Sequence, residues 1–211
     1  DDKGFKNAEV FIDQKDDPNN EGQVIVEIVV DKKEKVKVNA ITIVGNEVLT
    51  DKKLKRTMKK TNEKNKLVNF FRTKKFVEEN FEADKQLIID KYNEMGYRDA
   101  TILVDSVSPH DDKTVNVYLE IDEGQRYYLR NVNWVGNTLY SAEQMDYLLR
   151  MKKGDVYNQK LLSERVAEDE DAISNLYYNN GYIFSSVEPV EVNIVGDSID
   201  LEMRVIEGPQ A

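Results

Sequence analysis

Short alternating apolar segments and segments of helical periodicity follow one another along the chain in a fixed order. Val38 to Met58 reads VNAITIVGNEVLTDKKLKRTM, and Leu129 to Leu149 reads LRNVNWVGNTLYSAEQMDYLL. In each stretch an alternating segment ends in V-G-N and leads through a polar turn into a helical pattern. Alternation predicts a half-buried strand, and the glycine of Gly45-Asn46 or Gly136-Asn137 allows the positive φ of a tight turn. The two stretches therefore predict the same strand–turn–helix unit twice.

The helix of each unit has a polar residue at its expected start. Ser141 and Gln144 have capping-box spacing, in which each side chain bonds the other residue's backbone N–H. In the first unit Thr50 or Asp51 can cap the helix, although the box is incomplete. These residues place the helix starts near 51 and 142.

A second helical pattern follows in both units and ends at a glycine–tyrosine pair. Its apolar positions share one helix face, and they are Val77, Phe81, Ile88, Tyr92 and Met95 in the first unit. The counterpart predicts one helix through Leu162, Val166, Ile173, Leu176 and Tyr177. Glycine just past the last periodic residue is the expected C-terminal cap, so the helices should end at Gly96 and Gly181.

Two further strands close each unit before an acid–glycine pair, Glu123-Gly124 or Glu207-Gly208. We expect them at Asp99 to Val107 and Thr114 to Ile121, with a turn through Pro109 to Lys113, and at Ile183 to Ile194 and Ser198 to Ile206, with a turn at Gly196-Asp197. The predicted fold class is α+β: tandem repeats of a small β-α-α-β-β module, each a three-stranded sheet covered by two helices.

The repeats divide the chain into three parts. Residues 1–35 match only the end of a module, in Gly4-Phe5, Ala8 to Ile12 and Gln23 to Val30, so we expect the C-terminal part of a module in a chain that begins mid-module. Residues 36–125 form a complete module with an inter-helix insertion, because the interval from V-G-N to Gly-Tyr is 51 residues there and 45 in residues 126–211. The junction is short, and we expect a hinge at Gln125, Arg126, Tyr127 and Tyr128.

Net charge is −10, yet residues 51–75 hold eleven Lys/Arg and two acids. The acidic total disfavours nucleic acid as a partner. The basic cluster could dock on anionic headgroups or an acidic protein, aided by Leu67, Val68, Phe70 and Phe71, or it could be a solvated helix face with an apolar plug into its own core. The candidate basic patch comprises Lys52, Lys53, Lys55, Arg56, Lys59, Lys60, Lys64, Lys66, Arg72, Lys74 and Lys75.

The sequence offers no constellation for catalysis. Cysteine is absent, and the only histidine, His110, lies in an expected polar turn without partners for a triad or a zinc site. We therefore expect no enzyme, no cofactor and no metal.

One segment partly matches a calcium-binding loop, through Asp17, Asn19, Glu21 and Gly22. Position twelve of that loop is Ile28, where calcium needs a glutamate, so a hairpin turn explains these residues better. The acidic run Glu168 to Asp171 reads as a solvated helix face.

These segments together resemble POTRA domains, the polypeptide-transport-associated repeats of BamA-type outer-membrane protein assembly factors. The similarity is carried by ITIVGN at Ile41 to Asn46, VNWVGN at Val132 to Asn137, the MGYRDA and NGYIFS helix ends, and IDEGQRYYLRNV at Ile121 to Val132. The last segment resembles the junction between successive POTRA units. Two-partner secretion transporters and TamA-type transporters carry similar arms and remain the alternative, whereas the single unit of FtsQ does not fit tandem repeats.

The resemblance implies a periplasmic arm that precedes a transmembrane β-barrel. Such an arm receives unfolded outer-membrane proteins and docks accessory lipoproteins. Other classes left open are a periplasmic hydrolase, which needs a concave site with perturbed titratable groups, and a rigid spacer, which binds no strand peptides.

The docking mode favoured here is β-augmentation, in which an extended client segment pairs with a free sheet edge. The candidate edge is proline-free and rich in strand-forming residues: Ala100, Thr101, Ile102, Leu103 and Val104. The corresponding strand of the second module contains Pro189, which removes a backbone donor. The competing interpretation is a purely structural strand whose edge a neighbour covers.

Overall fold

The computed structural model describes residues 9–16, 18, 22–31, 36–64 and 75–211. The chain divides into two compact units, one comprising the described residues of Asp1–Leu87 and Leu103–Glu120, the other Ile88–Ile102 and Ile121–Ala211. The boundary passes through the first repeat, so that the end of its second helix and the turn after it belong to the second unit. None of the helices in these ranges combines the length and the apolar character needed to cross a membrane.

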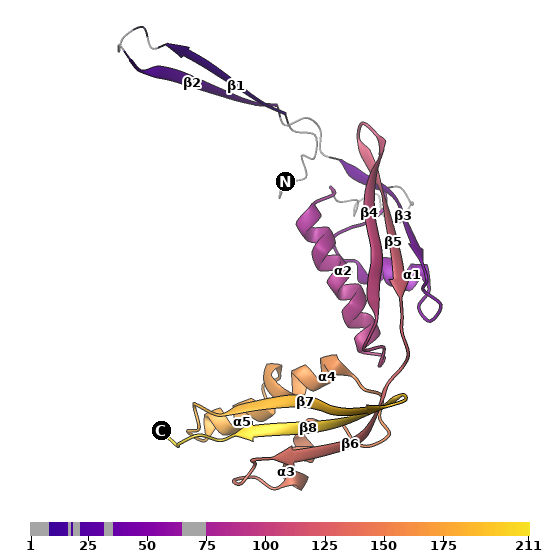
Figure 1. Cartoon of the computed structure of the whole chain (residues 1–211), viewed down its shortest axis with the longest axis vertical. Coiled ribbons are helices and arrows are strands. Elements are labelled where there is room, and N and C mark those ends of the chain that lie inside the picture. Colours follow the sequence, from indigo (N-terminus) through magenta and orange to yellow (C-terminus); the bar gives the residue numbers. More distant parts are fainter. Residues whose placement is uncertain (1–8, 17, 19–21, 32–35, 65–74) are drawn as a thin grey trace. The chain divides into compact units, whose positions relative to one another are not determined.

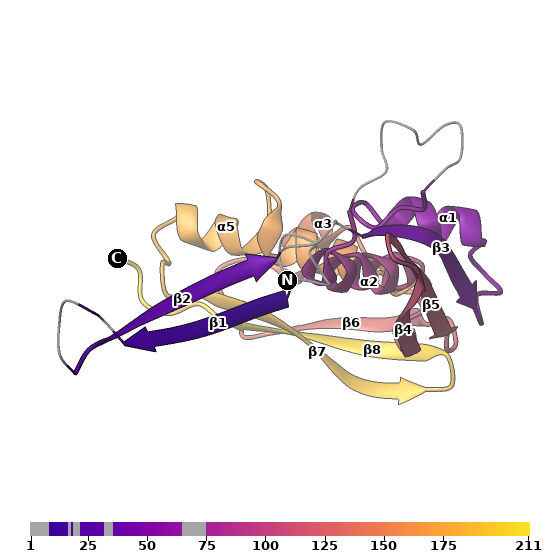
Figure 2. The same ribbon diagram turned by 90° about the horizontal axis from the view of Figure 1, so that it is seen from above.

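The first repeat is a three-stranded sheet with two helices on one face (Figures 1 and 2). Its elements are β3 (Lys37–Val44), α1 (Asp51–Thr57), α2 (Glu78–Asn93), β4 (Thr101–Asp111) and β5 (Thr114–Asp122). The strand order is β3-β5-β4, with β3 parallel to β5. The last strand of the module is therefore the central one, and β3 and β4 are both edges.

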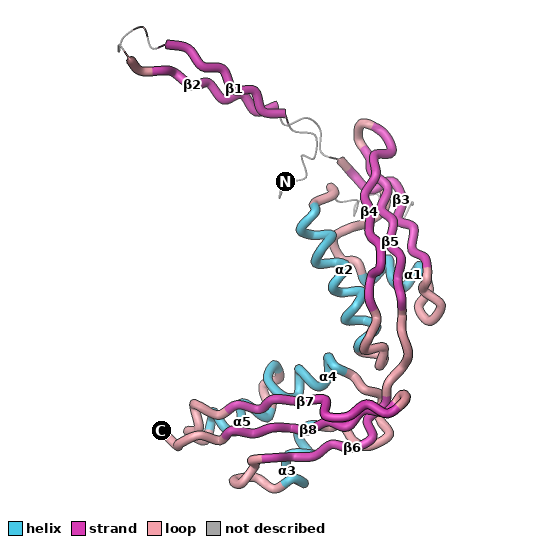
Figure 3. The backbone as a smooth tube through the Cα atoms, in the orientation of Figure 1, coloured by secondary structure: helices cyan, strands magenta, loops and turns pink. Residues whose placement is uncertain are grey.

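The second repeat has the same topology, with strand order β6-β8-β7 and β6 parallel to β8. Its elements are β6 (Tyr128–Val135), α3 (Ala142–Leu149), α4 (Gln159–Ser163), a π-helical turn η1 (Glu164–Glu168), α5 (Ile173–Asn179), β7 (Ser186–Val195) and β8 (Ser198–Ile206). Figure 3 shows the helical and extended segments of both repeats. The predicted β-α-α-β-β order is confirmed, apart from a break in the second helix.

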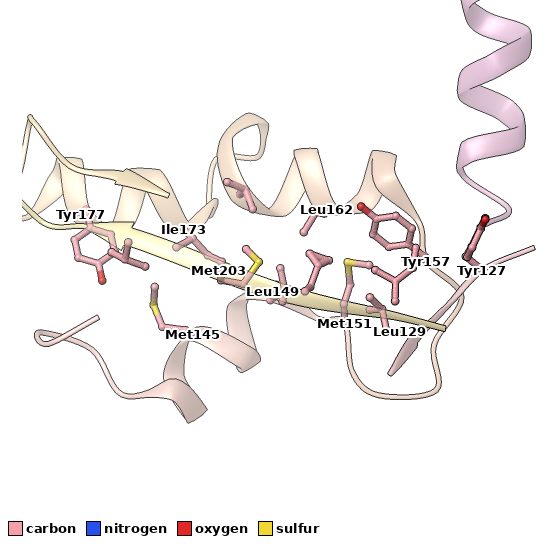
Figure 4. Packing of buried hydrophobic residues seen from close by; sticks show 14 residues of the cluster. Tyr127, Leu129, Met145, Leu149, Met151, Tyr157, Leu162, Ile173, Tyr177 and Met203 are labelled. Atoms are coloured by element: carbon pink, nitrogen blue, oxygen red, sulfur yellow. The ribbon is translucent and has the colours of Figure 1, made fainter. Parts of the chain in front are cut away.

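The central strands carry the core of each repeat. Alternate residues of β5 and β8 point under the helices, and each is at most 6% exposed: Val115, Val117, Leu119 and Ile121 in one repeat, Ile199, Leu201, Met203 and Val205 in the other. Burying a side chain of this size contributes roughly 1.5–3 kcal/mol. Figure 4 shows the second core, where Met203 lies among Leu149, Leu162 and Ile173.

The turn and cap residues have the predicted conformations. Gly45 and Gly136 have φ of 81° and 88°. The Thr50 side chain accepts a hydrogen bond from Lys53 N–H, and Ser141 and Gln144 complete a capping box. The local sequence signals and the tertiary fold therefore agree at both helix starts.

The acid–glycine pair that closes each repeat ties the last strand to a helix. The Tyr92 hydroxyl donates to Glu123 Oε1 at 2.7 Å, and the Tyr177 hydroxyl donates to Glu207 Oε1 at 3.2 Å. Burial raises the pKa of both tyrosines, and the neighbouring carboxylates raise it further. The glutamate of the acid–glycine pair and the helix tyrosine thus form the same hydrogen bond in both repeats.

The single helix predicted through Leu162 and Tyr177 is wrong. After η1 the backbone of Asp169 turns extended, with ψ of 154°, and a separate helix starts at Ile173. Arg165, only 2% exposed, donates to Asp169 and Asp171 and to the Leu148 carbonyl oxygen. The acidic run is therefore mostly solvent-exposed, as expected, but it continues past the end of the helical turn, and Asp169 and Asp171 bind a buried guanidinium.

The predicted limits of the closing hairpins are also corrected. Strand β4 continues through Pro109 and His110 to Asp111, which leaves a turn of two residues, because the Asp111 carboxylate accepts the Lys113 N–H at 2.8 Å. An edge strand tolerates the missing donor of proline. Strand β7 begins only at Ser186, since Ser185 N–H donates back to the Tyr182 carbonyl in a turn.

The N-terminal region contains an antiparallel hairpin, β1 (Glu9–Asp16) and β2 (Val24–Asp31). Its apolar residues are about half exposed or more, among them Phe11 at 56% and Ile28 at 61%. That the hairpin is the closing part of an earlier module remains a prediction. In the partial calcium motif, Gly22 has a turn φ of 80°, and Asp17, Asn19 and Glu21 lie outside the described residues.

Candidate docking edges and their charged neighbours

The candidate client edge lies at the start of β4, an edge strand of the first sheet. Thr101 to Val104 belong to the strand, and Leu103 and Val104 are 57% and 45% exposed. Ala100 precedes the strand, is buried, and donates its N–H to the Tyr97 carbonyl oxygen. Four of the five predicted residues can therefore face a partner strand, and the pairing itself stays a prediction.

The corresponding edge strand of the second sheet is irregular. Pro189 lies inside β7 and is paired with Met203 of β8, and the register shifts between Glu191 and Asn193. Proline and a bulge both interrupt the regular backbone pattern that an added strand would need. The predicted difference holds for the start of β4 only, because the longer strand includes Pro109 near its end, whereas Pro189 lies in the first half of β7.

The basic patch is partly engaged in the first repeat's own structure. Lys55 forms an ion pair with Glu63 at 2.9 Å, and Lys75 forms a backbone bridge with Lys37. Exposed basic residues are Lys52, Lys53, Arg56, Lys59, Lys60 and Lys64. Lys66, Arg72 and Lys74 lie outside the described ranges, as do the apolar residues Leu67, Val68, Phe70 and Phe71.

A buried carboxylate anchors the start of the insertion, and sequence reasoning missed it. Asp84 of α2 is 1% exposed and accepts the backbone N–H groups of Lys59, Lys60 and Thr61 at 2.8, 3.0 and 2.6 Å. Such charge-assisted bonds are stronger than neutral ones. No local pattern could reveal the contact, because its partners lie 23 to 25 residues apart.

The flanks of the insertion cover the outer edge of β3. Lys64 N–H donates to the Val38 carbonyl oxygen at 2.6 Å, and Ile41 N–H donates to the Glu63 carboxylate at 2.9 Å. Phe76 N–H closes the start of the strand by donating to the Val36 carbonyl. The first part of this edge, up to Ile41, is thus covered by its own chain, a role that sequence analysis left open.

The four predicted hinge residues lie in the second unit. Within that unit Tyr127 donates its N–H to the Gly96 carbonyl at 2.8 Å, and Arg126 donates to the Met95 carbonyl at 2.9 Å. Gln125 donates to the Gly196 carbonyl, and Tyr128 is the first residue of β6. Whether the segment bends remains a prediction.

Strand β6 starts with a bulge held by a charged pair. Arg130 donates two hydrogen bonds to the Asp200 carboxylate of β8, and the Asn131 amide adds a third at 2.8 Å. The hydrogen bonds from Arg130 are the main reason that the pKa of Asp200 falls to about 2. The pair fixes the register at which β6 enters the sheet.

We expect an NMR titration of the Asp200 carboxyl carbon to show a midpoint near pH 2. Since the folded pKa lies below the ordinary value of about 3.9, the pair stabilises the fold above that pH and loses its effect as pH falls towards 2. Arg130→Met should raise the midpoint further than Asn131→Ala does. A midpoint unmoved by Arg130→Met would contradict this assignment.

A groove that sequence analysis did not predict runs between β6 and the end of α3. Its volume is about 810 Å³, and its walls include Asn131, Val132, Tyr147, Arg150, Lys152 and Lys153. Elsewhere, no cluster of three or more His, Asp or Glu side chains that could hold a metal ion occurs in the described part of the chain. The groove therefore offers backbone, aromatic and charged contacts of both signs, since Asp146 and Asp155 also line it.

Comparison with known proteins matches both repeats to one family. Residues 36–124 and 127–208 match the family described as POTRA, surface antigen variable number repeat. Among curated proteins, a putative outer membrane protein assembly factor of Treponema pallidum is 26% identical over 186 residues, covering 86% of this chain and 21% of the relative. The outer membrane protein assembly factor BamA of Neisseria meningitidis is 28% identical over 190 residues, covering 88% and 23%. The chain thus spans about a fifth of the length of these relatives.

Two solved structures share the fold. POTRA3-5 of Haemophilus influenzae BamA has a TM-score of 0.63 at 23% identity, covering 83% of this chain and 67% of the other. BamA of Haemophilus ducreyi lacking POTRA domains 1-3 has a TM-score of 0.56 at 18% identity, covering 80% and 29%. Identities this low support the fold alone.

Proposed function

The chain belongs to the POTRA family, and from that premise we propose that it is a protein-binding scaffold in outer-membrane protein assembly. It acts as a periplasmic arm, binds unfolded outer-membrane proteins and docks accessory lipoproteins, and it catalyses no reaction. The relatives of Treponema and Neisseria, both named as assembly factors, support the proposal.

The observation that carries the proposal is the open edge of β4. An added strand gains backbone hydrogen bonds that contribute only about 0.5–1.5 kcal/mol each, so a short segment binds weakly and reversibly. Exposed Leu103 and Val104 add apolar contact area without demanding one client sequence. Weak, sequence-tolerant pairing suits a scaffold that must pass on many clients.

Photo-crosslinking tests this proposal at two matched positions. Ile102 of β4 and Val187 of β7 are both partly exposed residues of edge strands. Val187 lies two residues before Pro189, whereas the proline of β4, Pro109, lies seven residues beyond Ile102. With a photoreactive residue at either position, a urea-unfolded outer-membrane porin should be captured several-fold more at 102. Equal labelling, or none at either position, would count against client binding at β4. Folded porin is the control and should give no adduct.

A further inference from the structure

Basic side chains without partners follow one another along α1 and the start of the insertion. The five that are exposed and form no ion pair within the described part of the chain are called the cationic face: Lys52, Lys53, Arg56, Lys60 and Lys64. Lys55, by contrast, is paired with Glu63 at 2.9 Å. The charges of the cationic face are therefore available to a partner outside the repeat.

The helix directs part of the cationic face away from the core. Leu54 is 0% exposed and marks the buried side of α1, and Lys52 and Arg56 stand two residues before and after it. Since successive residues of an α-helix are turned by about 100°, both side chains point to the side opposite Leu54. The outward side of α1 is thus basic.

Hydrogen bonds hold the remaining cations beside the helix. The buried Asp84 carboxylate accepts the Lys60 N–H at 3.0 Å and leaves the Lys60 side chain exposed. Lys64 N–H donates to the Val38 carbonyl oxygen at 2.6 Å, and the ion pair of Lys55 with Glu63 ties the same stretch to α1. The cationic face therefore stands on a fixed backbone.

The acids around the cationic face reduce its charge and do not cancel it. Residues 46–64 hold seven Lys/Arg and three Asp/Glu, a sum of +4. Residues 75–87, which include the first part of α2, hold two Lys and four Asp/Glu, a sum of −2. One of those four acids, Asp84, is buried, and another, Glu82, is paired with Lys85. An excess of +2 thus remains in a chain whose net charge is −10.

The composition of the cationic face favours a bilayer surface over a protein as its partner. Four of the five residues are lysines, and no large apolar side chain is exposed between Leu49 and Lys64. Protein interfaces are built around aromatic and arginine anchors and are depleted in lysine. Attraction to anionic headgroups needs no such anchor, because the surface potential acts on each Lys or Arg separately.

We propose that the cationic face adsorbs the first repeat to the surface of a bilayer that contains anionic phospholipids. Lys52 and Arg56 face the headgroup phosphates, and the contact is electrostatic and reversible. Because the rest of the chain is acidic, the same surface potential repels it, so that the first repeat meets the bilayer in one orientation. The cationic face is separate from the β4 edge, and its role does not depend on client binding there.

Co-sedimentation of the full chain with lipid vesicles tests the proposal. Vesicles of equal parts phosphatidylcholine and phosphatidylglycerol should bind the chain at low ionic strength, and vesicles of phosphatidylcholine alone should not. At about 1 M salt the Debye length falls to about 3 Å, so the binding should be lost.

Two double variants that remove the same charge locate the contact. Lys52→Gln with Arg56→Gln should lower the partition coefficient by about ten- to thirtyfold, because each Lys or Arg near an anionic surface contributes about 1 kcal/mol. Lys152 and Lys153 of the second repeat are also exposed and form no ion pair among the described residues. Replacing both by Gln should lower the coefficient by less than about twofold. Circular dichroism spectra equal to that of the parent chain confirm that the variants are folded.

The proposal is overturned if the chain binds neither kind of vesicle or both equally, or if the two double variants lose the same affinity. A peptide of alternating Asp and Glu is the remaining probe. If it binds saturably, loses binding in the variant at 52 and 56, and the vesicles do not bind, the cationic face serves an acidic protein instead. Crosslinking at Ile102 is measured without lipid, so either outcome here leaves the proposed function to its own test.

Discussion

Gly136→Ala is expected to lower the free energy of unfolding of the second repeat by more than about 3 kcal/mol. Gly136 has φ of +88°, where a residue with a Cβ costs roughly 1–2 kcal/mol. A Cβ built at this position would also lie 2.1 Å from the carbonyl oxygen of Val205 at the end of β8. Because that neighbour is backbone, the end of the central strand would have to move, and the loss exceeds the conformational cost alone.

Gly154→Ala is the matched control. Gly154 has φ of +90° in the same repeat, but nothing lies within 4 Å of a Cβ built there. Its substitution should therefore cost only the backbone term of about 1–2 kcal/mol. Urea denaturation of the full chain, followed by Trp134 fluorescence, compares the two. Equal losses would show that contact with β8 plays no part at Gly136.

Asp84→Ala is expected to destabilise the first repeat by about 3 kcal/mol. The substitution removes the acceptor of three backbone N–H groups, and a buried donor left without a partner costs about 1–3 kcal/mol. Thr61 is 3% exposed and bears most of this cost, whereas Lys59 and Lys60 are exposed and can bond water. Urea denaturation followed by circular dichroism measures the loss, and amide exchange at residues 59–61 should accelerate.

Asp105→Ala is the control for that experiment. Asp105 forms an ion pair with Lys85 on the surface of the same repeat, and its side chain is 40% exposed. Exposed pairs contribute about 0–1 kcal/mol. If both aspartate variants lost the same stability, the anchoring of residues 59–61 by Asp84 would be refuted.

The repeat, its turns and its caps could be predicted because their signals are local. Gly45 and Gly136 need positive φ, Ser141 and Gln144 cap a helix start, and the period of apolar residues distinguishes strand from helix. Each of these features acts over a few residues of chain. The architecture of both complete modules follows from their order.

The contacts that sequence reasoning missed join residues far apart in the chain. The helix expected to continue past Asp169 ends there, and Arg165 binds the carboxylates of Asp169 and Asp171 at that end. The anchoring of Thr61 by Asp84 and the groove beside β6 likewise depend on which elements meet in space. The period of the apolar residues shows which face of a helix or strand is buried. It does not show which other helix or strand packs against that face.

The cover on the outer edge of β3 has a consequence for how arrays of this repeat diversify. The connector between the helices spans residues 58–77 in the first repeat and 150–158 in the second, and the longer one carries Glu63, whose carboxylate accepts the Ile41 N–H of β3. The length of one surface connector therefore sets how far a sheet edge is covered. It can change while the core residues stay as they are.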